Sequence, residues 1–127
     1  MLDPSDLLAI EQLAQRWLAC ELANRVPDVL GLCSEEIVWL PPGHSPVRGK
    51  EAIRSWLEGS RDRIVEIRLD HVTVVGDGNG ASRMANFTTR YIPPESVESA
   101  TVAGWHLWML RRDEDSTWRV TAVAWST

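Results

Sequence analysis

Helix-type and strand-type patterns occupy different halves of this chain, and this segregation constrains the fold most. Residues 3–58 carry apolar side chains at three- and four-residue spacing, which is typical of amphipathic helices. Residues 64–125 contain β-branched and aromatic runs separated by short turns. Helices followed by consecutive strands predict an α+β fold with an antiparallel sheet, built as one domain over residues 1–127.

The first half of the chain carries three helix signals. Asp3 is a suitable N-cap and Pro4 a suitable first-turn residue, which predicts a helix over residues 4–22. A second segment that begins with a proline predicts a short helix over 27–33. A third amphipathic segment predicts a helix over 50–58, after a proline-rich loop.

Strand-type runs fill the second half, and one of them changes phase. Its apolar residues fall on odd positions as far as Leu69 and on even positions from Val72. One extra residue in a strand produces such a change, so we predict a β-bulge near Asp70 and His71 that bends the sheet. Four predicted strands lie in this half, over residues 64–75, 82–92, 101–111 and 118–125, and a short one over 37–40 precedes the third helix.

The charge balance and the cysteines argue against several classes of function. The net charge is −5 and Lys50 is the only lysine, so the chain lacks the basic face that nucleic-acid binding requires. No apolar run approaches the roughly 18 residues of a membrane span. Cys20 and Cys33 have no metal-binding or redox spacing and are interpreted as free thiols. We therefore expect a cytoplasmic protein with no nucleic-acid and no membrane partner.

Several short segments occur in an order that is shared with a known superfamily. They are the long first helix, Asp28 in the short second helix, Pro41-Pro42 after the first strand, residues 47–53 at the third helix, residues 111–114 and 118–120 in the closing hairpin, and Ala124-Trp125. In this order the chain resembles the nuclear transport factor two-like superfamily, and within it the SnoaL-like proteins, whose relatives include ketosteroid isomerase and the polyketide cyclases. The resemblance covers nearly the whole chain.

This resemblance implies a cystatin-like cone, in which a strongly curved antiparallel sheet and three N-terminal helices enclose a mostly apolar cavity. Members of the family often dimerise through the outer face of the sheet. Their chemistry is usually acid/base work, in which a carboxylate or histidine moves a proton without a cofactor, so we expect no cofactor. No metal is expected either, since the three histidines lie in unrelated elements and form no HxH or HxxxH spacing.

The acid/base set of ketosteroid isomerase does not match this sequence. In the register that the resemblance implies, its general base falls at Leu40, its hydroxyl donor at Trp17 and its protonated carboxylic acid at Trp105. Leucine cannot accept a proton, and an indole offers a single N–H donor. A slip of one residue would change this result only at Trp39 or His106, and Trp39 offers no base.

The same register implies which side chains face the cavity. The predicted wall consists of Trp17, Val38, Leu40, Met84, Asn86, Thr88, Arg90, Trp105, Leu107, Val123 and Trp125. The opposite parity predicts an outer sheet face that carries Phe87, Tyr91, His106 and Trp108. A large apolar patch of this kind is typical of an interface, so we expect a homodimer through that face.

Asp70, His71 and Arg90 are the candidate acid/base residues. An inward Arg90 needs a carboxylate or a ligand with an anionic or carbonyl group, because a buried polar group without a partner costs about 1–3 kcal/mol. A β-bulge often turns a side chain towards a site, which would place Asp70 and His71 beside Arg90. Alternatively, Arg90 reaches water at the rim or pairs with Asp70 or Asp28, and His71 faces solvent or a dimer interface.

Two functions from different classes are compatible with this sequence. The first is a small-molecule-binding protein, or a cofactor-independent isomerase, cyclase or hydrolase, for an apolar aromatic or polycyclic ligand with a carbonyl or hydroxyl. The second is a non-catalytic dimeric interaction or scaffold domain whose cavity is filled by its own tryptophans. The missing isomerase residues favour the second function, and the polar residues predicted inside the strand over 82–92 favour the first. We favour a binding pocket.

Overall fold

One curved, open sheet forms the body of the molecule. Its strands are β1 (Cys33–Leu40), β2 (Val47–Arg48), β3 (Arg63–Gly76), β4 (Gly80–Ile92), β5 (Ala100–Arg112) and β6 (Trp118–Ser126). They lie in the order β2-β1-β6-β5-β4-β3, so β2 and β3 are the two edges. Neighbouring strands are antiparallel except β1 and β6, which run parallel. The predicted α+β fold with a strongly curved sheet is confirmed.

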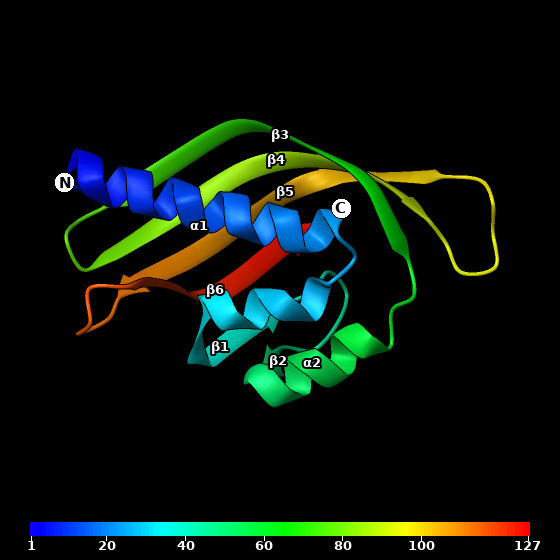
Figure 1. The fold of residues 1–127 in the computed structure, drawn as a ribbon, viewed down its shortest axis with the longest axis horizontal. Helices are drawn as coiled ribbons and strands as arrows, with labels where there is room; N and C mark the ends of the chain where they lie inside the picture. The colour runs from blue at the N-terminus through cyan, green and yellow to red at the C-terminus, as the bar shows by residue number, and fades with distance from the viewer.

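The first helix crosses the hollow face of this sheet. In the computed structural model, which describes residues 1–127, α1 (Pro4–Leu22) lies over β4 and β5 (Figure 1). Asp3 caps the helix, since its Oδ1 accepts a hydrogen bond of 2.9 Å from the backbone N–H of Asp6. Both predicted ends of this helix are therefore confirmed.

Two short helices lie at the β1–β2 end of the sheet (Figure 1). The segment η1 (Val26–Leu32) is a 3₁₀-helix, and Cys33, predicted as the end of this helix, is the first residue of β1. The helix α2 (Lys50–Glu58) has the predicted bounds, and Gly49 precedes it with φ of 86°, a conformation that favours glycine. The strand β2 lies in the segment that the sequence predicted as a loop.

The strand pairing shifts register at four points, and two of them correspond to extra residues near His71 in β3 and at Thr121 in β6. The β3–β4 register shifts between Asp70 and Thr73, and His71 has φ of 54° in the left-handed region. This is the bulge that the change of phase in the sequence predicted. A second shift separates Met109 from Leu110 in the pairing of β5 with β6. Bulges of this kind increase the local twist of a strand and help a sheet to wrap around a helix.

A packed core fills the space under the first half of α1. Ile10 and Leu13 are buried against residues of the sheet such as Leu110 and Val120. Complete burial of such a side chain contributes about 1.5–3 kcal/mol. Because this core is solid, any cavity must lie under the second half of the helix.

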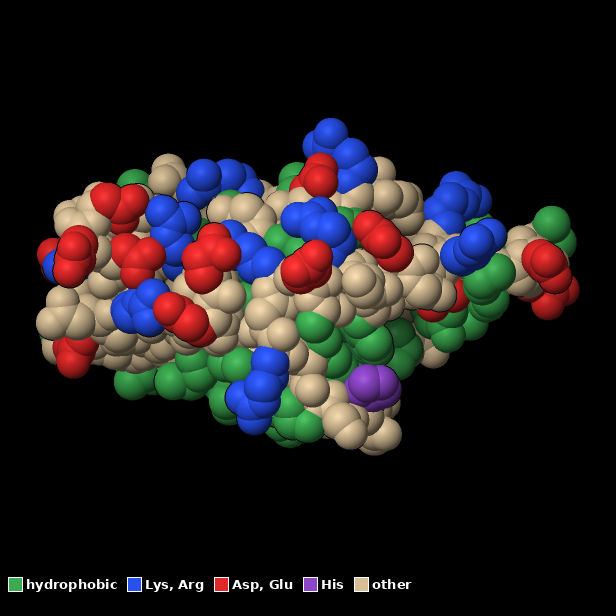
Figure 2. Space-filling model, turned by 90° about the horizontal axis from the view of Figure 1, so that it is seen from below, with side chains coloured by type: hydrophobic (Ala, Val, Ile, Leu, Met, Phe, Trp, Pro, Cys, Tyr) green, Lys and Arg blue, Asp and Glu red, His purple; other side chains and the backbone are tan.

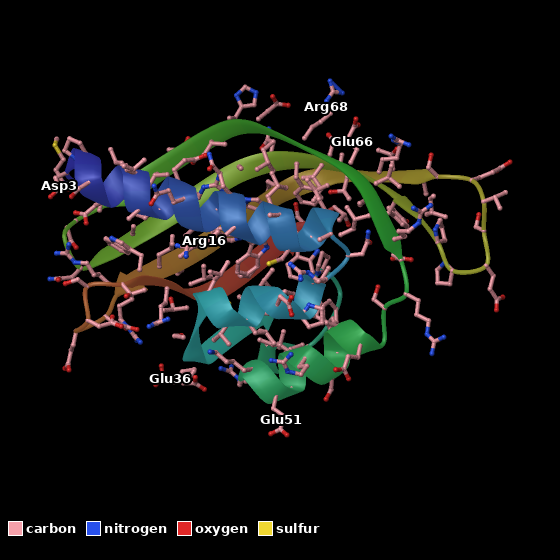
Figure 3. The ribbon with its side chains drawn as sticks, viewed as in Figure 1. Asp3, Arg16, Glu36, Glu51, Glu66 and Arg68 are labelled. Carbon is pink, nitrogen blue, oxygen red and sulfur yellow. The ribbon has the colours of Figure 1, made fainter.

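The molecular surface is divided between charged and apolar regions. In the view of Figure 2, acidic and basic side chains alternate over the upper part, and hydrophobic side chains gather along the lower part. The side chains of Glu66 and Arg68 extend away from the edge strand β3 (Figure 3). Charged side chains on an edge strand oppose pairing with the edge of another sheet.

The cysteines form no disulfide, as the sequence predicted. Cys20 and Cys33 are free, and Cys33 is buried. None of the helices combines the length and the apolar character that a transmembrane helix requires.

Candidate functional site

A cavity of about 480 Å³ lies between the second half of α1 and the hollow face of the sheet. Its wall begins at Ala14 on α1 and includes side chains from η1, α2 and five of the six strands. Sixteen of its 24 lining residues are hydrophobic. A volume of this size is within the range of small-molecule sites in proteins, and a molecule of two or three fused rings would fit in it.

Five tryptophans from five different elements form a continuous part of this wall. The ring of Trp17 on α1 lies 4.5 Å from that of Trp108 and 5.9 Å from that of Trp39, between ring centroids. Trp125 lies 5.8 Å from Trp39 and 6.1 Å from Trp56. Rings at these distances support one another in fixed orientations. The wall is therefore rigid and presents large aromatic surfaces.

A buried arginine and a histidine form a polar pair in the wall. Arg83 on β4 is 2% exposed, and its Nη1 lies 3.5 Å from Nε2 of His106 on β5. The Arg83 guanidinium also lies over the ring of Trp108, 5.1 Å from its centroid, and His106 stacks between Trp108 and Phe87. Burial and, to a lesser degree, the charge of Arg83 lower the pKa of His106 from 6.5 to about 4. The imidazole is therefore neutral near pH 7 and accepts a hydrogen bond from Arg83.

Glu21 supplies a carboxyl group to the same cavity, near the end of α1. Burial raises its pKa from 4.5 to about 7, although a hydrogen bond from Trp17 acts in the opposite direction. Next to it, the Asn24 side chain accepts a hydrogen bond of 2.8 Å from the backbone of Ile64 and holds this end of α1 against β3. A carboxyl with this pKa exchanges protons readily near neutral pH, as an acid/base residue must.

The structure places the predicted wall residues in two groups. Trp17, Val123 and Trp125 line the cavity. The inward placement of the others is wrong, because their side chains lie on the outer face of the sheet: Val38, Leu40, Met84, Asn86, Thr88, Arg90, Trp105 and Leu107. The four residues predicted for the outer face line the cavity instead: Phe87, Tyr91, His106 and Trp108.

An extra residue in β6 explains this inversion. Thr121 has no partner on β5, because the register shifts between Met109 and Leu110. The inward positions of β6 therefore change from even to odd numbers at Thr121, whereas those of β5 remain even. Without this extra residue, the register that pairs Leu110 with Val120 would pair Trp125 with Trp105, which lies on the outer face. The observed partner of Trp125 is His106. A shift of one residue moves every side chain to the other face.

The predicted cluster of Asp70, His71 and Arg90 does not form. Asp70 lies opposite Asn86 in the β3–β4 ladder, whereas Arg90 lies opposite Glu66, four residues away. All three side chains of the predicted cluster are exposed on the outside of the molecule. The bulge at His71 bends the strand but does not direct this side chain into the cavity.

Arg83 and Glu21 are two of the polar cavity residues that the sequence analysis did not assign to the wall. A usable signal was present for Arg83, since Trp118 and Val120 are followed by Val123 and Trp125, a change of phase like the one in β3. A bulge at that position predicts that the even-numbered side chains of β5 face the cavity. Arg83 on β4, which pairs with Trp108 on β5, then faces the cavity too. Glu21 carried no such signal, because a glutamate near a helix end is usually a solvated residue.

A comparison with known families agrees with this geometry. A family model described as a SnoaL-like domain matches residues 14–122, which include the cavity-lining half of α1 and most of the sheet. The chain belongs to the SnoaL-like family. No curated protein sequence is detectably similar to this SnoaL-like domain.

Solved structures share the fold of this SnoaL-like domain at low sequence identity. A putative aromatic ring hydroxylase from Novosphingobium aromaticivorans superposes with a TM-score of 0.85 at 22% identity, over 99% of this chain and 91% of that one. A putative scytalone dehydratase from the same organism gives 0.83 at 13%, over 97% and 84%. A ketosteroid isomerase-like protein from Erwinia carotovora atroseptica gives 0.81 at 16%, over 98% and 97%. These likenesses show the fold.

The observed register also changes the comparison with the isomerase pattern. The inward position at the end of β1 belongs to Trp39 instead of Leu40, and the inward position on β5 belongs to His106 instead of Trp105. Trp39 still supplies no base, so this SnoaL-like domain lacks the isomerase aspartate. His106, however, puts a group that forms hydrogen bonds where the sequence register had placed an indole.

Proposed function

We propose that this SnoaL-like domain binds a flat, apolar small molecule in its cavity and moves a proton of that molecule without a cofactor. The observation that carries the proposal is Glu21, a carboxyl group with a pKa of about 7 in a wall built from tryptophans. The aromatic walls favour an aromatic or polycyclic ligand. The cavity volume favours this function over a cavity filled by its own tryptophans.

Binding of the ligand and proton transfer are assigned to different parts of the cavity. Arg83 and His106 hold an oxygen of the ligand and so orient it in the cavity. Glu21, when ionised, accepts a proton from a carbon next to a carbonyl and returns it to the same or another position of the ligand. Such a step needs no cofactor and is common to isomerisation, cyclisation and dehydration. The class of reaction depends on the ligand.

Proton transfer can be tested before the ligand is known. The probe is 2-tetralone, a bicyclic ketone with acidic hydrogens next to its carbonyl, in deuterated water at pH 7. We expect the protein to accelerate deuterium incorporation, measured by NMR, and Glu21→Gln to remove at least about nine-tenths of this acceleration. Glu58→Gln, which changes an exposed glutamate of α2, is the matched control. Incorporation at the rate of protein-free buffer would contradict the catalytic part of the proposal.

We also propose that the protein self-associates through the outer face of the sheet. The residues on that face differ from those that the sequence predicted. Leu40, Ala124, Leu107 and Met84 are successive partners across β1, β6, β5 and β4 and form an apolar row. Leu40 and Met84 are 41% and 47% exposed. Because this row carries no charge, a second copy of the same face is a suitable partner.

The outer-face proposal predicts a homodimer that charge disrupts. Met84→Lys should convert the dimer into a monomer in size-exclusion chromatography with light scattering, because two lysines would face each other across the two-fold axis. Val97→Lys, on the exposed loop between β4 and β5, introduces the same charge away from the row and should leave the dimer intact. A wild-type monomer at micromolar concentration would contradict the proposal.

A cytoplasmic location is also proposed. Free thiols at Cys20 and Cys33 fit a reducing compartment. Detection of the protein in the periplasm or the culture medium of the organism that naturally produces it would contradict this location.

A further inference from the structure

The charge of Arg83 is only partly balanced by the protein. Its nearest carboxylate belongs to Glu11 on α1, whose oxygen lies 4.0 Å from Nη2 and whose side chain is 51% exposed. The other polar neighbour is His106, and the near-neutral imidazole brings no negative charge. Burial of a cation without a close counter-ion is unfavourable, so an anion that reaches this position gains a strong interaction.

The hydrogen-bonding capacity of Arg83 is also incomplete. Its Nε is buried and donates to no group of the protein, although this side chain lines the cavity. The indole Nε1 of Trp39 is a second buried donor without a partner, in the same wall. Buried donors in native proteins normally have an acceptor. Two donors without an acceptor therefore lie in a single cavity wall.

The rings around Arg83 select a flat molecule. Phe87, His106 and Trp108 are stacked with angles of 13° and 16° between successive planes. Arg83 and Trp108 are nearly inaccessible to solvent, whereas Ser60 and Asp62 at the other part of the wall are exposed. The cavity is therefore closed at Arg83 and Trp108 and open near Ser60 and Asp62.

We propose that the ligand is an aromatic carboxylic acid, whose carboxylate accepts hydrogen bonds from Arg83 at the closed end of the cavity. The planar guanidinium suits a carboxylate, because it can donate two parallel hydrogen bonds. The rings of the acid lie along the tryptophan wall, and the part of the molecule nearer the opening faces Glu21. This inference rests on the proposed function of the cavity and names its class of substrate.

Calorimetric titration with two probes of the same shape tests the inference. 2-Naphthoate carries a carboxylate and 2-naphthamide a neutral amide on the same ring system. We expect naphthoate to bind about 10- to 100-fold more tightly than naphthamide at pH 7. The net charge of −5 gives no general attraction for anions, so a preference of this size reports a local cation. Arg83→Gln should remove the preference, so that naphthoate binds no more tightly than naphthamide.

A second variant, Glu11→Gln, tests the same interaction without changing Arg83. Glu11→Gln removes the only carboxylate beside Arg83 from a half-exposed position and should increase naphthoate affinity about threefold without changing naphthamide affinity. Glu58→Gln is the control. Equal affinity for both probes would overturn the carboxylate inference and leave the aromatic pocket supported. Failure of both probes to bind would overturn the inference and the proposed function together.

Discussion

Two titratable side chains in one cavity have pKa values that are shifted in opposite directions from their ordinary values. Burial raises the pKa of Glu21 to about 7 and lowers the pKa of His106 to about 4. Both changes have the same physical origin, because a poorly solvated environment disfavours the charged form of either group. At pH 6 both Glu21 and His106 are thus mostly uncharged, whereas the charge of Arg83 persists.

These two groups predict opposite effects of pH on stability. Between pH 4.5 and 7 the folded state keeps the Glu21 proton that the unfolded state releases, so this group lowers stability as pH rises. Between pH 4 and 6.5 the unfolded state binds a proton at His106 that the folded state does not, so this group raises stability as pH rises. The two contributions oppose each other in the wild-type protein.

Removing either side chain should reveal the effect of the other on the pH dependence of stability. From pH 4.5 to 6.5, we expect the free energy of unfolding to rise by about 1–2 kcal/mol in Glu21→Gln and to fall by a similar amount in His106→Gln. Urea unfolding at a series of pH values, followed by tryptophan fluorescence, measures both profiles. Parallel profiles for the two variants would show that these residues do not have the environments assigned to them.

Single extra residues in β3 and β6 decide which side chains of these strands face the cavity. In β3 the extra residue lies beside His71, which adopts φ of 54°. In β6 it is Thr121, whose hydroxyl donates a hydrogen bond of 3.2 Å to the carbonyl of Met109. Each bulge changes which side chains face inward beyond it. The cavity side of β6 changes at Thr121 from the phase of Trp118 to that of Trp125.

The bulge at His71 predicts an unusual response to glycine. Left-handed backbone costs a residue with a side chain about 1–2 kcal/mol, so His71→Gly should leave the free energy of unfolding unchanged or raise it. His71→Val should lower it by about 1–2 kcal/mol, because a β-branched residue tolerates this conformation poorly. In the neighbouring position, Val72→Gly should lower stability by up to about 1 kcal/mol. Equal losses in His71→Gly and Val72→Gly, measured by urea unfolding, would place the bulge elsewhere.

At the scale of the whole molecule, one buried carboxylate joins the two ends of the chain. Oδ1 of Asp6 accepts hydrogen bonds of 3.0 Å from Arg112 and 3.2 Å from the indole of Trp118. Asp6 is 5% exposed. The contact attaches the start of α1 to the closing β5–β6 hairpin.

Loss of this carboxylate should destabilise the whole fold. We expect Asp6→Ala to lower the free energy of unfolding by about 2–4 kcal/mol, because it leaves two donors without their acceptor. Asp6→Asn, which keeps an acceptor for Trp118, should cost less. Asp3→Ala, which removes only the exposed cap of the same helix, is the comparison, and urea unfolding is the measurement. A loss in Asp6→Ala no larger than that in Asp3→Ala would show that the buried contact contributes little.

The sequence by itself determined the elements of this protein apart from β2 and the boundary between η1 and β1. The caps, prolines and glycines specify the ends of α1 and α2, and the change of phase between Leu69 and Val72 specifies the β3 bulge. These signals are local, since each depends on residues a few positions apart. The order of the elements also indicated the SnoaL-like cone, which the family match confirms.

Only the tertiary structure decided which face of the sheet encloses the cavity. Both faces are apolar, with Trp108 and Trp125 inside and Met84 and Trp105 outside, so hydrophobic alternation does not distinguish them. The choice depends on the register between strands, which the bulge at Thr121 changes by one residue. The polar site depends on it too, because burial by groups distant in sequence, and not residue type, gives Arg83, His106 and Glu21 their properties.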